Sequence, residues 1–64
     1  MNKVREFREK RLMTRSELAK AADLSISTIA RIEQGKDERP SIRTIRKILS
    51  ALEIPPEKKE LVFL

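Results

Sequence analysis

Residues 14–35, TRSELAKAADLSISTIARIEQG, decide the fold that this chain can adopt. Thr14 and Glu17 have the spacing of a capping box, in which each side chain accepts a hydrogen bond from the other residue's backbone N–H. A helix should therefore begin just after Thr14 and continue to about residue 22. The apolar residues that would share its inner face at helical spacing are Leu18, Ala19 and Ala22.

A second helix should follow closely, over about residues 26–34. Ser25 suits its N-cap, because the hydroxyl can accept a hydrogen bond from a free backbone N–H of the first turn. Ile29 and Ile32 supply a new apolar face, and Gly35 can take the left-handed conformation that ends many helices. Two short helices around a tight turn have the geometry of a helix-turn-helix, whose second helix can enter the major groove of DNA.

Three further helices are expected around this unit. Asn2 can cap a helix over residues 2–11, whose inner face would carry Val4, Phe7 and Arg11. After the loop KDERP, where Pro40 interrupts any helix, Ser41 can cap the next one. Its apolar face would consist of Ile42, Ile45, Ile48, Leu49 and Leu52. A last short helix should begin at Pro56 and cover residues 56–61.

The chain is therefore expected to form one all-α domain over residues 1–64. No strand pattern, internal repeat, linker or low-complexity segment interrupts the five expected helices. The link at residues 12–13 should place Met13, rather than Leu12, in the core. A domain of this size buries only about 60% of the surface that its unfolded chain exposes, so its core is small.

Positive charge flanks the central unit and is balanced within it. The formal net charge is +5. Residues 1–11 and residues 36–47 each carry five basic and two acidic groups, whereas residues 14–35 carry three of each. A basic balance favours a polyanionic partner, and this distribution suits a protein whose flanks contact phosphates.

The composition argues against several other classes of function. The chain has no cysteine and no histidine, which excludes disulfides, the usual zinc sites and Cys- or His-based nucleophiles. Without a glycine-rich phosphate loop or an evident carboxylate pair, neither an enzyme nor a cofactor or metal is expected. Two phenylalanines without Tyr or Trp give no stacking platform for single strands or RNA. No apolar run approaches the roughly 18 residues of a membrane span, and a cytoplasmic location is expected.

The run from Met13 to Lys36 closely resembles the helix-turn-helix of the lambda-repressor and Cro-like (XRE) family of bacterial and phage regulators. The family pattern is roughly T-Q-x-E-L-A, a turn with a small apolar residue and Ser, and then S-x-I-x-x-I-E-x-G. The matching residues here are Thr14, Glu17, Leu18, Ala19, Leu24, Ser25, Thr28, Ile29, Ile32, Glu33 and Gly35. The likeness extends into the first and fourth helices and covers nearly the whole chain.

This resemblance implies a compact four- to five-helix lambda-repressor-like domain with the helix-turn-helix at its second and third helices. It implies a sequence-specific regulator, expected to be a repressor, that binds duplex DNA as a two-fold dimer on a pseudo-palindromic operator in a bacterial, archaeal or phage setting. In relatives, Arg8 and Glu33 occupy positions that pair across two helices, so their role should be mainly architectural. The residues expected at DNA phosphates are Thr14, Arg15, Ser25, Thr28, Lys36, Arg39 and Arg43. Asp37 and Glu38 lie in the same loop and oppose this role, so only part of the loop can face DNA.

The outward face of the third helix should contact base edges, since Ile29 and Ile32 point inward. Arg31 is the strongest candidate, because a guanidinium can donate to both O6 and N7 of guanine. Instead of contacting a base, Arg31 could be a solvated surface residue or could contact a phosphate. An exposed isoleucine at the helix start fits a thymine methyl, but it can equally be a lone surface residue. The residues expected at bases are Ile26, Ser27, Arg31 and Gln34.

Three positions depart from the family pattern. Arg15 replaces the usual Gln, which would make a phosphate contact charge-assisted and less directional. Asp23 replaces a frequent Gly in the turn, and Asp tolerates the left-handed region better than most residues. Leu12 stands where Gly, Asn or a polar residue is common, and the sequence offers no physical account of it.

The C-terminal tail and the biological role leave alternatives open. The apolar residues 61–64 can fold back on the core, form a two-fold interface within the tail 56–64, or mark an excised domain whose continuation is missing. Of these, the dimer interface is favoured. Besides a regulator, the chain could be the antitoxin of a toxin–antitoxin pair, with the toxin as its partner. A third alternative is a protein-interaction module that reuses the fold.

Overall fold

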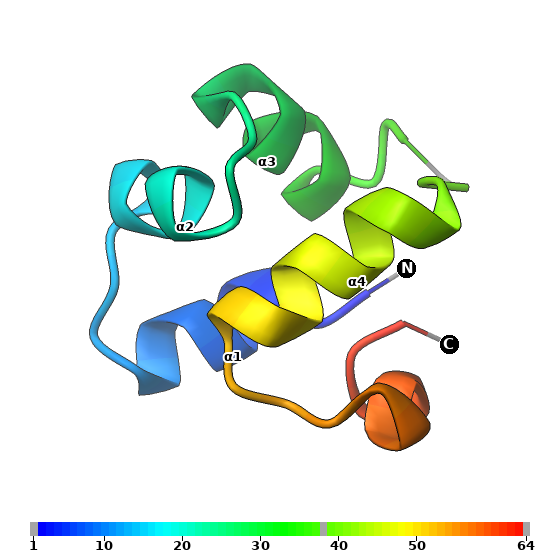
Figure 1. Ribbon diagram of the computed structural model, residues 1–64. Helices are drawn as coiled ribbons and strands as arrows, with labels where there is room; N and C mark the ends of the chain where they lie inside the picture. The colour runs from blue at the N-terminus through cyan, green and yellow to red at the C-terminus, as the bar shows by residue number, and fades with distance from the viewer. Residues whose placement is uncertain (1, 38, 64) are drawn as a thin grey trace.

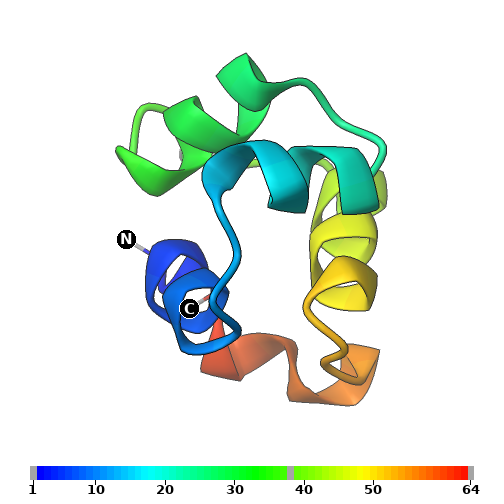
Figure 2. The same cartoon turned by 90° about the vertical axis from the view of Figure 1, so that its left-hand side faces the viewer.

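The computed structural model describes residues 2–37 and 39–63, which form five short helices. Two helices, α2 and α3, lie together at one end of the molecule, α1 and η1 lie at the other, and α4 runs between them (Figures 1 and 2). The bounds of the helices are α1 Val4–Lys10, α2 Arg15–Ala21, α3 Ile26–Glu33, α4 Ile42–Ala51 and the 3₁₀ helix η1 Pro56–Leu61. The expected all-α fold is confirmed over these residues. None of these helices has the length and apolar character needed to cross a bilayer.

The capping chemistry expected from the sequence starts three of the helices. Thr14 and Glu17 form a complete capping box, with the Thr14 hydroxyl 3.0 Å from the Glu17 nitrogen and the Glu17 carboxylate 2.7 Å from the Thr14 nitrogen. At α3 and α4, the hydroxyls of Ser25 and Ser41 each accept a hydrogen bond from a threonine N–H at 3.1 Å. These bonds satisfy N–H groups that have no partner inside the helix.

All four α-helices end in the same way, on a residue with positive φ. In α3 the Gly35 N–H donates to the Ile32 carbonyl and the Lys36 N–H to the Arg31 carbonyl, which is the Schellman arrangement. The left-handed residues after the four helices are Leu12 (φ 56°), Asp23 (φ 55°), Gly35 (φ 75°) and Glu53 (φ 58°). This explains the unusual leucine: it occupies a position that favours Gly or Asn, at a cost of roughly 1–2 kcal/mol for an L-residue.

The core draws on every α-helix and on the chain end. The expected inner residues of α2 and α3 are fully buried, and Met13 packs against them from the link before α2. The buried apolar residues are Val4, Leu18, Ala19, Ala22, Ile29, Ile32, Ile48, Leu49, Leu52, Val62 and Phe63. Among the described residues, no buried side-chain polar atom is without a hydrogen-bond partner.

The start of α1 differs from the prediction. The helix begins at Val4, and Asn2 instead pairs with Phe63 in an isolated antiparallel bridge, although its side chain still accepts the Val4 N–H. Arg11 does not share the inner face, because α1 ends at Lys10 and the Arg11 side chain turns to Glu53 at 2.7 Å. The polar residue that lies on the buried face is Arg8, which is 8% exposed.

Two apolar segments also lie differently from the sequence expectation. Ile42 is the first residue of α4 and is 79% exposed, since the helix turns its apolar face to the core only from Ile45 onward. In the tail, Val62 and Phe63 are buried in their own domain, as the fold-back alternative expected, while Leu61 stays 52% exposed. Leu64 lies outside the described residues.

Candidate nucleic-acid interface

The third helix presents one face to solvent because its opposite face is anchored. Ile29 and Ile32 are 0% exposed, which fixes the rotation of α3 about its axis. Ser27, Arg31 and Gln34 follow one another at helical spacing on the exposed side. Ile26 stands at the helix start and is 51% exposed. The four residues expected at bases are therefore all accessible on α3 and its end.

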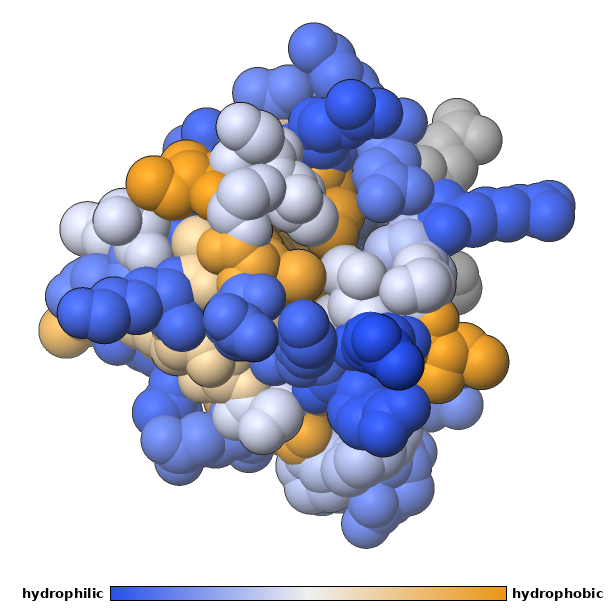
Figure 3. Space-filling view, turned by 45° about the horizontal axis from the view of Figure 1, so that its top comes forward, coloured by the Kyte–Doolittle hydropathy of each residue, from blue (hydrophilic) through white to orange (hydrophobic). Residues whose placement is uncertain are grey.

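The surface around α3 is mostly hydrophilic. Figure 3 shows the molecule with its top turned toward the viewer: hydrophilic side chains cover most of this face, and one group of apolar side chains lies left of its centre. The first turns of α3 and α4 contain no acidic residue. An anion near either N-terminus would therefore meet the positive end of the helix dipole with no carboxylate in the first turn of the helix.

Three cations expected at phosphates come from two segments beside this helix. Lys36 and Arg39 lie in the loop after α3, and Arg43 lies in the first turn of α4. All three side chains are exposed. Of the two acidic residues in this loop, Asp37 is only partly exposed, and Glu38 lies outside the described residues. Whether these side chains meet DNA remains a prediction.

The hydroxyl groups expected at phosphates are already used in capping. Thr14 caps α2, and the Ser25 hydroxyl accepts the Thr28 N–H while lying 2.8 Å from the Thr28 hydroxyl. One hydroxyl of that pair donates to the other, so a single O–H of the two is left to donate elsewhere. No three His, Cys, Asp or Glu side chains within residues 2–37 and 39–63 cluster as they would around a metal ion.

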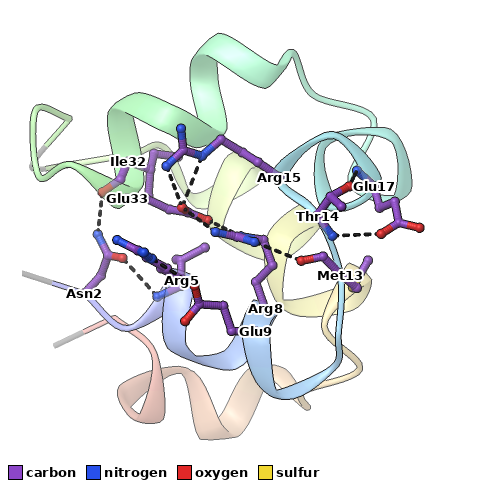
Figure 4. A network of polar contacts seen from close by, with 11 residues as sticks. Asn2, Arg5, Arg8, Glu9, Met13, Thr14, Arg15, Glu17, Ile32 and Glu33 are labelled. Atoms are coloured by element: carbon purple, nitrogen blue, oxygen red, sulfur yellow. Dashed lines mark hydrogen bonds and ion pairs between the residues drawn. The ribbon is translucent and has the colours of Figure 1, made fainter.

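A buried ion network joins α1, α2 and α3 behind this face (Figure 4). The Glu33 side chain is 1% exposed and binds Arg8 through two bonds of 2.7 and 3.2 Å. Arg8 also donates to the Met13 carbonyl at 2.8 Å, which fixes the link before α2. The hydrogen bond to Glu33 raises the pKa of the Arg8 guanidinium above its ordinary value, although burial acts in the opposite direction. The architectural role expected of this pair agrees with its geometry.

Arg15 joins the same network, which the sequence did not predict. Its Nε and Nη2 atoms lie 3.3 and 3.2 Å from one Glu33 oxygen. The side chain is 37% exposed, and the third nitrogen, Nη1, points away from Glu33 (Figure 4). The only signal in the sequence was the replacement of a neutral family residue by a cation, because no local pattern relates two residues 18 positions apart.

The capped helix pair, its tight turn and the exposed outer face of α3 define a helix-turn-helix domain, the DNA-binding class found in transcriptional regulators. The family model described as Helix-turn-helix matches residues 4–59, and the chain belongs to this family, in its lambda-repressor and Cro-like (XRE) form. The match spans all four α-helices and most of η1.

Two curated proteins of Bacillus subtilis (strain 168) are similar to this chain over 54 residues. One, at 43% identity, is named HTH-type transcriptional repressor RghR. The other, at 39% identity, is named uncharacterized HTH-type transcriptional regulator RghRB. The aligned region covers 84% of this chain but only 40% and 39% of the two relatives, so the chain spans about two fifths of their length. No solved structure is significantly similar to the chain.

Proposed function

We propose that this domain regulates transcription by binding a specific duplex DNA sequence with α3 in the major groove. The observation that carries the proposal is the fixed rotation of α3. Ile29 and Ile32 hold one side in the core, and the opposite side offers Ser27, Arg31 and Gln34. Cations from α2, the loop after α3 and the start of α4 flank this helix. They would bind the phosphates that border the groove, while α3 distinguishes the bases.

Repression is the direction of regulation that we propose. The domain would block a promoter by occupying it, a mechanism that needs no catalysis and no ligand. One of the two relatives is named a repressor, which supports this direction. A reporter whose promoter overlaps the bound sequence should lose expression when the domain is supplied. Increased expression would contradict repression but not DNA binding.

A homodimer is the assembly that we propose on DNA. Two copies related by a two-fold axis would place their α3 helices in successive major grooves, about 34–36 Å apart. Since Val62 and Phe63 are buried in their own domain, Leu61 is the part of the expected tail interface that remains exposed. Footprints of two equal half-sites would support the dimer, and a single half-site would contradict it.

The central experiment is the selection of bound duplexes from a random pool, followed by footprinting. We expect a two-fold consensus and an affinity that falls steeply with salt, because phosphate neutralisation releases counterions. Arg31→Ala should relax selectivity at one base pair per half-site, by roughly 10-fold if the arginine donates to guanine. Lys58→Ala is a matched control, because it removes one exposed cation from η1 at the opposite end of the molecule. Recovery of no consensus would refute specific DNA recognition and favour a protein-interaction module.

A further inference from the structure

Arg15 is held on one side and open on the other. Glu33 accepts hydrogen bonds from its Nε and Nη2 atoms, at 3.3 and 3.2 Å, through the single oxygen Oε1. The Glu33 side chain is 1% exposed, whereas the Arg15 side chain is 37% exposed. The remaining nitrogen of Arg15, Nη1, points away from the Glu33 carboxylate (Figure 4). The guanidinium is thus oriented by a buried group while one of its edges stays accessible.

We propose that Glu33 is a positioning residue for DNA binding: it holds Arg15 as a pre-oriented phosphate contact at the edge of α3. This inference rests on the proposed function, since it assigns a role to a residue that would not itself touch DNA. Arg15 would bind a backbone phosphate through Nη1, and Glu33 would keep the other edge of the guanidinium fixed.

The charges in the network support this assignment. Glu33 already has a buried partner in Arg8, which binds both carboxylate oxygens at 2.7 and 3.2 Å. One carboxylate between two guanidiniums leaves one positive charge in excess, and that excess lies at the more exposed residue, Arg15. A phosphate bound at Arg15 would complete a row of alternating charges: Arg8, Glu33, Arg15 and the phosphate. The buried charges of Arg8 and Glu33 already balance each other.

The geometry also explains why the contact would depend on an arginine. A guanidinium is a planar fork that can bind a carboxylate along one edge and a phosphate oxygen along another. A lysine ammonium carries the same charge but cannot be oriented in this way. Because the side chain is already held, binding would cost little of the rotamer entropy that a free surface arginine loses.

The network would also join the DNA backbone contact to the recognition helix. Glu33 is the last residue of α3, Arg15 the first of α2, and Arg8 reaches from α1 to the Met13 carbonyl before α2. A phosphate bound at Arg15 is therefore separated from α3 by one side-chain contact. The phosphate contact would fix the position of α3 relative to the groove.

Substitutions at Arg15 test the contact without disturbing the buried pair. In a plot of log affinity against log salt concentration for the selected duplex, Arg15→Gln should reduce the slope by about 0.9 for each subunit bound. Arg15→Lys should keep the slope but weaken binding by roughly 5- to 10-fold, because it retains the charge and loses the orientation. An unchanged slope for Arg15→Gln, or wild-type affinity for Arg15→Lys, would overturn the inference.

A second comparison tests the role of Glu33. Replacing Glu33 alone would leave the buried Arg8 charge unbalanced. The comparison therefore uses Arg8→Met, which keeps the Glu33–Arg15 pair, and the double variant Arg8→Met/Glu33→Leu, in which residue 33 has no side-chain oxygen to accept a hydrogen bond from Arg15. The affinity loss caused by Arg15→Gln should be about threefold or more larger in the first background than in the second, since only the first can orient Arg15. Equal losses would show that Glu33 is structural only. Circular dichroism identifies the folded variants. If the double variant does not fold, Arg15→Lys in the wild-type background decides the inference, because it keeps the charge and loses only the orientation that Glu33 supplies, and wild-type affinity would then overturn the positioning role.

Failure of the inference can be told apart from failure of the proposed function. If the wild-type domain selects no consensus duplex, the proposed function is wrong. If it selects one with steep salt dependence and the Arg15 variants behave as wild type, DNA binding stands and the positioning role of Glu33 falls.

Discussion

Two helices of this domain begin with nearly the same eight residues. Residues 25–32 are SISTIARI and residues 41–48 are SIRTIRKI, so five positions are identical. The two helices therefore share one local pattern of capping and apolar residues. The shared positions have shared structural roles: a serine N-cap, an exposed isoleucine, a threonine bonded to the cap, and a last isoleucine that is 0% exposed in both helices.

The positions that differ are the ones that face outward. In α3 they are Ser27, Ala30 and Arg31, whereas in α4 they are Arg43, Arg46 and Lys47. In the proposed complex, two small neutral residues would leave room for α3 to approach base edges, while three cations would suit the phosphate backbone. Lys47 in addition lies 3.8 Å from the exposed Asp23 carboxylate, in the turn of the helix-turn-helix. One capping and packing pattern can therefore build both helices, and the three outward side chains of each helix account for the difference between their proposed roles.

Burial also differs between the two helices and gives the largest expected effect. Ile29 is 0% exposed, but its equivalent in α4, Ile45, is only partly buried. We expect Ile29→Ala to lower the free energy of unfolding by about 3–4 kcal/mol and Ile45→Ala by about 1–2 kcal/mol. Urea denaturation followed by circular dichroism measures both. Equal losses would mean that the two helices are anchored equally well.

Exchanging outward residues should change DNA recognition without changing the fold. Ser27→Arg/Ala30→Arg gives α3 the cations of α4 and should lower the ratio of specific to non-specific affinity by roughly 10-fold, through tighter non-specific binding. The reciprocal variant Arg43→Ser should retain the consensus while its salt slope falls by about 0.9 per subunit. Competition with random duplexes measures both. An unchanged ratio in the first variant would show that these positions do not face bases.

The two serine caps should be equivalent for stability. Ser25→Ala and Ser41→Ala each remove one hydroxyl that accepts a threonine N–H at 3.1 Å. Each should cost about 1 kcal/mol, which corresponds to roughly 4–8 °C in Tm for a domain of this size. Thermal denaturation of both variants at one protein concentration makes the comparison. A clearly larger loss at either serine would mean that its cap does more than satisfy the helix end.

The helix ends supply the smallest expected effects. Gly35 has φ 75° and open space around it, so Gly35→Ala should destabilise by about 1 kcal/mol through backbone strain alone. At the equivalent position after α4, Glu53→Gly should raise the free energy of unfolding by about 0.5 kcal/mol, because it relieves backbone strain but removes the exposed ion pair with Arg11. Leu12→Gly is the control, because it relieves the same strain without losing an ion pair. It should stabilise the domain slightly more than Glu53→Gly does. Chemical denaturation of the three variants checks the order, and a loss at Leu12→Gly would contradict the strain argument.

Local chemistry made much of the fold predictable. The capping box at Thr14, the left-handed Asp23 and Gly35, and the inward isoleucines of α3 are each determined by neighbours within a few residues. Ile42 shows where such reasoning stops: helical spacing places it in line with apolar residues, but it does not say at which turn the helix meets the core. The apolar tail likewise indicated burial, but the sequence did not determine whether Val62 and Phe63 pack into their own domain or against a second copy.

The candidate site likewise has one part that local spacing predicted and one part that depends on tertiary packing. The accessible face of α3 followed from the spacing of Ile29 and Ile32, because burial of one face fixes the other. The contact between Arg15 and Glu33 did not follow, since it depends on how two helices pack. Pairing of this kind is decided by tertiary geometry, and only the structure brings the two residues together.

The bridge between Asn2 and Phe63 has a consequence for when the domain can complete its structure. The Lys3 N–H donates to the Val62 carbonyl at 2.8 Å, so the start of α1 is bound by residues that are synthesised after all five helices of the domain. Local turns and caps can form early, but these contacts require closure of nearly the whole chain, which makes them slow to form. Asn2 also donates to the Ile32 carbonyl at 2.8 Å, which links this late event to the end of α3. During synthesis, α3 therefore acquires its full support only when residue 63 has emerged.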